Sequence, residues 1–188
     1  MRKITHEEAL QLIDQHISTV TRRRHMTAVA AIMRGLAEKL DRNKLEWELV
    51  GLLHDLDYDM VRGDVSKHGL VAAKMLEGKL SEECLHAIRS HDYRAGVEPE
   101  SILDKALIAA DCFSILIQRF AYHTSHGRID GVTLDALKNT LEDESFPQFL
   151  KNGVIQCRDF GLSLDDLLRT ALMAMPIDLI ISEDNLQI

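Results

Sequence analysis

Apolar positions recur three and four residues apart along most of the chain, a spacing that is typical of amphipathic helices. Between residues 21 and 40, for example, one face collects Val29, Ile32, Met33, Leu36 and Leu40. Strand signals are weak, because no long stretch alternates β-branched or aromatic residues with polar ones. The pattern therefore predicts an all-α protein.

Polar residues that cap helix N-termini set the expected boundaries. Thr5 stands three residues before Glu8, Asn43 before Glu46, and Ser163 before Asp166. The predicted helices cover about residues 5–17, 21–40, 43–54, 66–76, 81–91, 101–122, 133–144, a short segment from 147, and 163–175. Residues 57–65 and 123–131 are polar and contain glycine, which predicts loops there.

A chain of 188 residues with only 5% aromatic residues favours one helical bundle with an aliphatic core. We expect a single domain over residues 1–188, with a core at about 22–120 and accessory helices at about 133–188. The net charge of −8 argues against dedicated nucleic-acid binding but leaves room for a small phosphorylated substrate. Three scattered cysteines, no apolar leader and no spanning segment predict a cytoplasmic protein without a membrane partner.

Imidazoles and carboxylates interrupt the apolar pattern at a few places. The dyad His54-Asp55 ends the apolar run 49–53, and Asp111 lies inside the apolar run 106–117. His25 is one turn before Val29, on the inward face of its helix. An unpaired ionised carboxylate among apolar neighbours is very costly, so Asp111 must be neutralised, form a salt bridge or coordinate a metal.

Taken together, these residues predict a metal centre with one set of ligands on each successive helix. The candidate ligands are His25, His54, Asp55, His68, His91 and Asp111. Each alone has a plain structural alternative, a satisfied core histidine or a buried salt bridge. His6, His16, His86, His123 and His126 lack the pattern, and we expect His86 on a solvated face and the last two in a loop. Hard N and O ligands suit one or two divalent ions of Fe, Mn, Mg, Zn, Ni or Co.

Other charged residues close to these ligands are candidates for chemistry. Asp57, Asp59 and Asp92 could donate a proton to a leaving group, and Lys67, Arg89 and Arg94 could hold a substrate phosphate. The alternative for each is an ordinary solvated charge. The sequence contains no nucleophile elbow of the GxSxG type, which disfavours a serine hydrolase. A glycine-rich phosphate loop is also absent.

The ordered pattern resembles the HD superfamily of metal-dependent phosphohydrolases, with the signature H…HD…D at His25, His54-Asp55 and Asp111. His68 and His91 resemble the additional ligands of the two-metal subset, and the chain is more weakly similar to stand-alone HDIG-type proteins. The resemblance implies a helical HD-type bundle and hydrolysis of a phosphomonoester or phosphodiester, on a nucleotide or another small phosphorylated substrate. It also implies that Asp55 bridges two ions, that His25, His54 and Asp111 complete one site, and that His68 and His91 complete the other.

The chain departs from other branches of that superfamily after the dyad. It continues with Leu56-Asp57-Tyr58-Asp59, where other branches have Ile-Gly or Ile-Gly-Lys, and it contains no Gly-Tyr-Pro triplet. Both departures argue against a cyclic-dinucleotide phosphodiesterase. Two alternatives stay open at this stage: a di-iron enzyme that activates oxygen on the same ligands, and a non-catalytic regulatory module that keeps a metal.

Overall fold

A computed structural model describes residues 3–124 and 128–175, and the regular secondary structure within these ranges is helical throughout, which confirms the predicted all-α class. The α-helices are α1 (His6–His16), α2 (Val20–Lys39), α3 (Lys44–Leu53), α4 (Leu70–Met75), α5 (Glu82–Ser90), α6 (Ile102–Thr124), α7 (Leu134–Glu142), α8 (Gln148–Ile155) and α9 (Leu164–Ala174). Short 3-10 turns are η1 (Val65–Lys67), η2 (Tyr93–Ala95), η3 (Ile129–Gly131) and η4 (Gln156–Phe160).

The predicted capping residues begin the helices as expected. Thr5 forms a complete capping box with Glu8, since each side chain accepts a hydrogen bond from the other residue's backbone N–H. The side chains of Asn43, Ser81, Thr133 and Ser163 accept from the backbone N–H three residues later. These bonds satisfy amide groups that have no partner within the helix.

The fourth helix differs from the prediction, because it begins at Leu70 and not at Ser66. Ser66 lies in η1 and its hydroxyl donates to Asp64, so it does not cap α4. Gly69 has φ of +77°, a conformation that interrupts a right-handed helix and that glycine adopts at little cost. At the other end of the core, α6 continues to Thr124, so His123 lies in this helix and not in a loop; His126 is outside the described residues.

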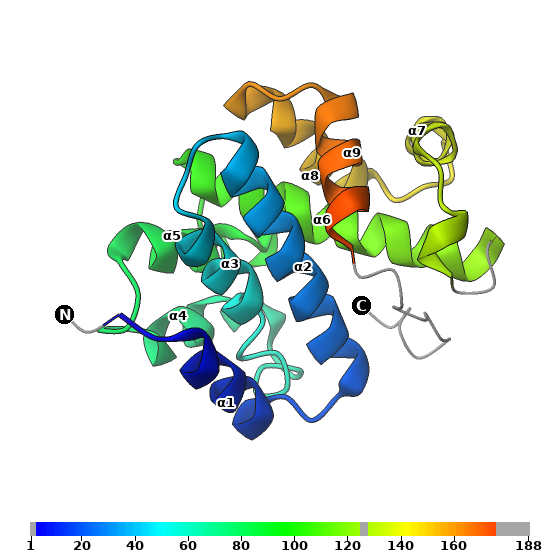
Figure 1. Cartoon of the computed structure of the whole chain (residues 1–188). Coiled ribbons are helices and arrows are strands. Elements are labelled where there is room, and N and C mark those ends of the chain that lie inside the picture. The colour runs from blue at the N-terminus through cyan, green and yellow to red at the C-terminus, as the bar shows by residue number, and fades with distance from the viewer. Residues whose placement is uncertain (1–2, 125–127, 176–188) are drawn as a thin grey trace.

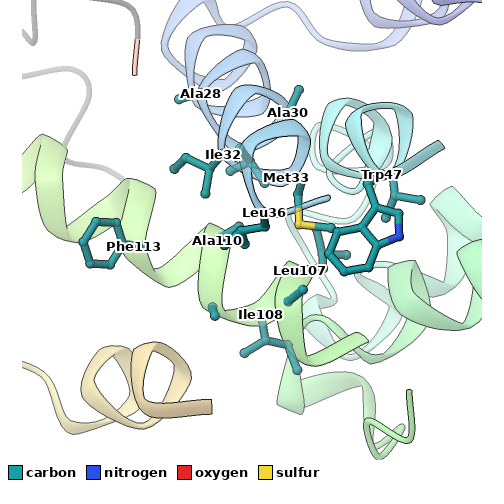
Figure 2. Packing of buried hydrophobic residues seen from close by; sticks show 14 of the residues in the cluster. Ala28, Ala30, Ile32, Met33, Leu36, Trp47, Leu107, Ile108, Ala110 and Phe113 are labelled. Carbon is teal, nitrogen blue, oxygen red and sulfur yellow. The ribbon is translucent and has the colours of Figure 1, made fainter. Parts of the chain in front are cut away.

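Helix α2 packs against α3, α6 and α9, while α1 packs on α3 and α4 on α5 (Figure 1). Val29, Ile32, Met33 and Leu36 are buried along one face of α2, at the predicted spacing. Figure 2 shows Met33 and Leu36 near Leu107 in this core. The crossing of α2 and α3 is close because Gly51 has no side chain: a Cβ there would lie 2.9 Å from the Cα of Ala30.

The C-terminal helices cover the remaining faces of α6 and α2. α8 and η4 pack on α6, and α9 packs on both α2 and α6. Their buried residues, such as Leu150 and Leu167, join the same hydrophobic cluster as those of the N-terminal helices. Residues 176–188, the end of the predicted accessory region, are outside the described residues. In the part of the chain that is described, no helix combines the length and apolarity needed to cross a bilayer.

Candidate metal centre

All six candidate ligands from the sequence meet in one place beneath α2. His25 comes from α2, His54 and Asp55 follow α3, His68 precedes α4, His91 follows α5, and Asp111 comes from α6. Their ligand atoms form three overlapping groups, each with all atoms within 4.8 Å of one another: His25, His54 and Asp55; His54, His91 and Asp111; and Asp55, His68 and His91. The long spacing in sequence thus becomes a compact cluster.

Asp55 lies at the centre of the cluster. Its Oδ1 is 3.0 Å from His68 Nε2, 3.3 Å from His54 Nε2 and 3.6 Å from His91 Nε2. Its Oδ2 is 3.6 Å from His25 Nε2. One carboxylate therefore faces the Nε2 atoms of all four imidazoles. The second carboxylate, Asp111, lies at the His25 end, with Oδ1 3.0 Å from His25 Nε2.

Three of the imidazoles are fixed by a hydrogen bond at their other nitrogen. His54 Nδ1 is 2.8 Å from the carbonyl oxygen of Gly51, and His91 Nδ1 is 2.7 Å from that of Ile88. His68 Nδ1 is 2.8 Å from Asp57 Oδ1. Because a carbonyl or carboxylate oxygen can only accept, these Nδ1 atoms carry a hydrogen, and the Nε2 side of each ring faces the cluster.

Asp57 is buried and uses both carboxylate oxygens within the fold. Oδ1 bonds to His68, and Oδ2 accepts from the backbone N–H of Ala72 at 2.8 Å, in the first turn of α4. The sequence marked Asp57 as a candidate proton donor for catalysis, and that role stays a prediction. Its contacts favour a different one, in which Asp57 sets the orientation of His68 and anchors α4.

Gly69 brings the His68 and His91 segments together. A Cβ at this position would lie 2.4 Å from the carbonyl oxygen of Ile88 and 3.1 Å from His91 Nδ1. That carbonyl is the same group that fixes the His91 ring. The positive φ and this close approach therefore both require glycine here. In the sequence, the indication of a close approach was a glycine directly after the candidate ligand His68.

The charges of the cluster suit a cation. Burial lowers the pKa of His54 to about 4, so this ring is neutral at neutral pH and keeps its lone pair. Burial alone would raise the pKa of Asp111, but the close approach of the His25 ring lowers it to about 2. Burial would also raise the pKa of Asp55, and His54 with Arg22 hold it well below its usual range. Two ionised carboxylates therefore share a buried cluster.

His68 shows where positive charge is needed. Burial would lower the pKa of its ring, but hydrogen bonds to Asp55 and Asp57 raise it to about 10. In the absence of a metal the ring therefore holds a proton between two carboxylates. A divalent cation placed beside Asp55 would supply the same compensation.

Two buried nitrogen atoms give a direct test of whether a cation fits. His25 Nε2 and His54 Nε2 are fully enclosed and make no hydrogen bond. The 3.0 Å approach of His25 Nε2 to Asp111 is an ion-pair distance without the geometry of a hydrogen bond. An unpartnered buried nitrogen is costly unless a ligand binds it. Both atoms point into the carboxylate cluster, so the residues present fit a metal ion.

Arg22 is a residue of the cluster that the sequence analysis missed. Its Nη1 donates to Asp55 Oδ2 at 2.7 Å, and its guanidinium lies 3.5 Å above the ring of Tyr58. Both members of this ion pair are buried. The available signal was its spacing, because Arg22 is three residues before His25 and so shares the inward face of α2.

The other predicted site residues are engaged in ion pairs or hydrogen bonds with residues outside the set of six ligands. Asp59 accepts from Ser18 and Arg62, Lys67 pairs with Asp64, Arg89 with Glu82, and Arg94 with Asp92. Their roles with a substrate or a leaving group stay predictions. His86 is not on a solvated face as expected: it is half-buried, and its Nδ1 lies 2.8 Å from the buried Asp104 of α6.

Comparison with known proteins agrees with this geometry. A family model described as HD domain matches residues 22–116, just over half of the chain, and this range contains every ligand of the cluster. Among curated proteins and solved structures, nothing matches. The chain therefore belongs to the HD domain family, a superfamily of metal-dependent hydrolases.

Proposed function

We propose that this protein is a phosphohydrolase that uses two divalent cations to cleave a small phosphate ester, a nucleotide among the candidates. The observation that carries the proposal is the arrangement of four imidazole Nε2 atoms around Asp55, with Asp111 at one end. Membership of the HD family supports metal-dependent hydrolysis as the reaction class.

Asp55 would bridge the two cations. His25, His54 and Asp111 would complete one position, and His68 and His91 the other. His91 also lies within reach of His54 and Asp111, so the two positions adjoin closely. When bound, divalent cations supply an acidified water and neutralise charge on a phosphoryl group.

The protein's own residues orient and shield this centre. Asp111 is the most exposed of the six ligands, with 18% of its side chain accessible, so we place the approach of substrate on that side. The enclosed imidazoles exclude bulk water elsewhere. Arg22 holds the second oxygen of Asp55 and so fixes the plane of the shared carboxylate. Arg94 is half exposed and pairs with Asp92, the residue after the ligand His91, so among the predicted cations we assign it the binding of a phosphate.

The test combines metal analysis of the purified protein with a phosphate-release screen. Nucleotides, sugar phosphates and aryl phosphates are offered with Mn, Mg, Ni, Co or Zn added. We expect release of phosphate by the wild type, and loss of both bound metal and activity in Asp55→Asn. Full metal stoichiometry in Asp55→Asn would contradict the assignment of ligands. Bound iron with oxygen-dependent turnover, and no hydrolysis, would replace the proposal with the di-iron alternative.

A further inference from the structure

The imidazole of His25 differs from the other three because α6 contacts both of its nitrogens. Asp111 Oδ1 lies 3.0 Å from Nε2, and Ser114 Oγ lies 3.3 Å from Nδ1. Ser114 follows Asp111 by three residues, so both side chains project from the same face of the helix. The partners at the other Nδ1 atoms can only accept, whereas a serine hydroxyl can both donate and accept.

The contact continues to a second buried polar residue. The side-chain amide of Gln118 donates to Ser114 Oγ at 2.8 Å, one turn further along α6. Ser114 is fully buried and Gln118 is 1% exposed, among apolar neighbours such as Phe113 and Ile117. The amide oxygen of Gln118 has no hydrogen-bond partner. A buried oxygen without a hydrogen-bond partner is costly, so a serine and a glutamine at these positions need a reason.

The series of hydrogen bonds from His25 through Ser114 to Gln118 can run in either of two directions. In one, Gln118 donates to Ser114, Ser114 donates to His25 Nδ1, and the hydrogen on Nε2 faces Asp111. In the other, His25 Nδ1 donates to Ser114, and Ser114 donates to the amide oxygen of Gln118 after the amide turns over. Solvent takes up the proton that leaves Nε2 and supplies the one that Nδ1 gains, so the exchange balances and the net charge of the imidazole is the same in both directions.

We propose that Ser114 and Gln118 are positioning residues that let His25 change tautomer when a cation binds. In the metal-free protein the first direction turns the Nε2 hydrogen toward Asp111, 3.0 Å away but without the geometry of a hydrogen bond, and the second direction frees the Nε2 lone pair for the metal. His54, His68 and His91 have no such freedom, because their Nδ1 hydrogens are fixed by carbonyl or carboxylate oxygens. This inference rests on the proposed metal centre. It adds that binding of a cation changes the hydrogen bonds of Ser114 and Gln118 in α6.

The experiment follows the ring nitrogens of ¹⁵N-histidine-labelled protein by NMR, first after chelator treatment and then with Zn²⁺ alone. We expect the hydrogen of His25 on Nε2 without zinc and on Nδ1 with zinc, while His54 and His91 keep Nδ1–H in both states. The spectrum of His25→Gln assigns the signals. In Ser114→Ala, zinc affinity measured against a chromophoric chelator should fall by about tenfold or more, the usual effect of losing a partner of a metal-binding histidine.

Two further variants isolate the hydrogen-bond chain from general packing. Gln118→Met removes the amide at similar volume and should also weaken zinc binding, which keeps the test available should Ser114→Ala fail to fold. Ser90→Ala deletes another buried serine hydroxyl, which donates to the Ala87 carbonyl and not to a ring, and should keep wild-type zinc affinity.

The outcomes separate this inference from the proposed function. Wild-type protein that binds no zinc would overturn the metal centre itself. Wild-type protein that binds zinc, but whose His25 already carries Nδ1–H before zinc is added, would overturn only the tautomer change. Unchanged zinc affinity in both Ser114→Ala and Gln118→Met would likewise overturn the positioning role alone.

Discussion

At the scale of single residues, Asp57 can be tested for one of two roles, proton transfer in catalysis or orientation of the His68 ring. We expect Asp57→Asn to lower metal affinity by about 10- to 100-fold, because an amide orients the His68 ring less firmly than a carboxylate does. The helical fold should persist, since an asparagine oxygen can still accept from the Ala72 N–H. Isothermal titration with Mn²⁺ or Zn²⁺ measures the change.

Asp59→Asn is the matched control for that variant. Asp59 is two residues away, and its bonds go to Ser18 and Arg62 and not to a ligand. Metal affinity within about twofold of the wild type is expected there. If Asp57→Asn binds metal as tightly as Asp59→Asn but loses turnover, Asp57 acts in proton transfer, as the sequence first suggested.

From the sequence we predicted the residues that gather in the cluster, but not the contacts that support them, and the reason is physical. A histidine or aspartate within an apolar run is visible because burial of such groups is costly without a partner. Asp57 is one of three aspartates in residues 55–59, and Arg22 is the first of three consecutive arginines. Only the folded chain shows that Asp57 bonds to His68 and Arg22 to Asp55. Contacts between residues far apart in sequence have no local signature.

At the scale of elements, the junction of α4 and α5 depends on one glycine. Gly69→Ala should destabilise the protein by more than the roughly 1 kcal/mol that a positive φ costs a residue with a Cβ. The added carbon would meet the Ile88 carbonyl at 2.4 Å and push α4 away from α5. We therefore expect weaker metal binding as well, since His68 and His91 stand on either side of this contact. Urea unfolding and metal titration measure both effects.

Gly78→Ala separates backbone strain from this close approach. Gly78 has φ of +75°, nearly the same as Gly69, but no heavy atom lies within 4 Å of the position of its Cβ. This variant should lose only about 1 kcal/mol and keep wild-type metal affinity. Equal losses in the two variants would show that the Ile88 contact has no part in the effect.

The start of α6 carries a buried carboxylate whose protonation should govern acid stability. Burial would raise the pKa of Asp104, but hydrogen bonds from Ser101, Glu100 and His86 lower it below the ordinary value. A carboxylate with a lowered folded pKa stabilises the protein above the unfolded pKa of about 3.9, and the stabilisation is lost as pH falls through the folded pKa. Asp104→Asn should thus be less stable than wild type at neutral pH and lose less stability below about pH 4.

Asp135→Asn is the control for the acid experiment, because Asp135 also lies in the first turn of a helix but is exposed. Urea unfolding at several pH values between neutral and acid gives the slopes. The control should follow the wild type. If the free energy of unfolding of Asp104→Asn depends on pH as that of the wild type does, Asp104 does not govern acid stability.

Helix boundaries could be predicted wherever a side chain caps the first turn, and less well where the chain is bent by a tertiary contact. The predicted start at Ser66 was wrong because η1 and the turn at Gly69 bring His68 to the cluster before α4 begins. The end of α6 was predicted two residues too early, at Tyr122. Helix propensity describes an isolated segment, whereas these two helix boundaries depend on tertiary contacts of the folded chain.

At the scale of the whole molecule, the candidate ligands come from five segments between α2 and α6, so a bound cation would link all five. A cation that binds only the folded chain stabilises it by about 4 kcal/mol at a thousandfold excess over its dissociation constant. For a protein of this size that corresponds to roughly 8–16 °C in the unfolding temperature. We expect a rise of this order on adding Zn²⁺ or Mn²⁺ to chelator-treated protein. Asp111→Asn, which removes one ligand charge at constant volume, should show a much smaller rise, and an equal rise in that variant would mean that the stabilising ion binds elsewhere.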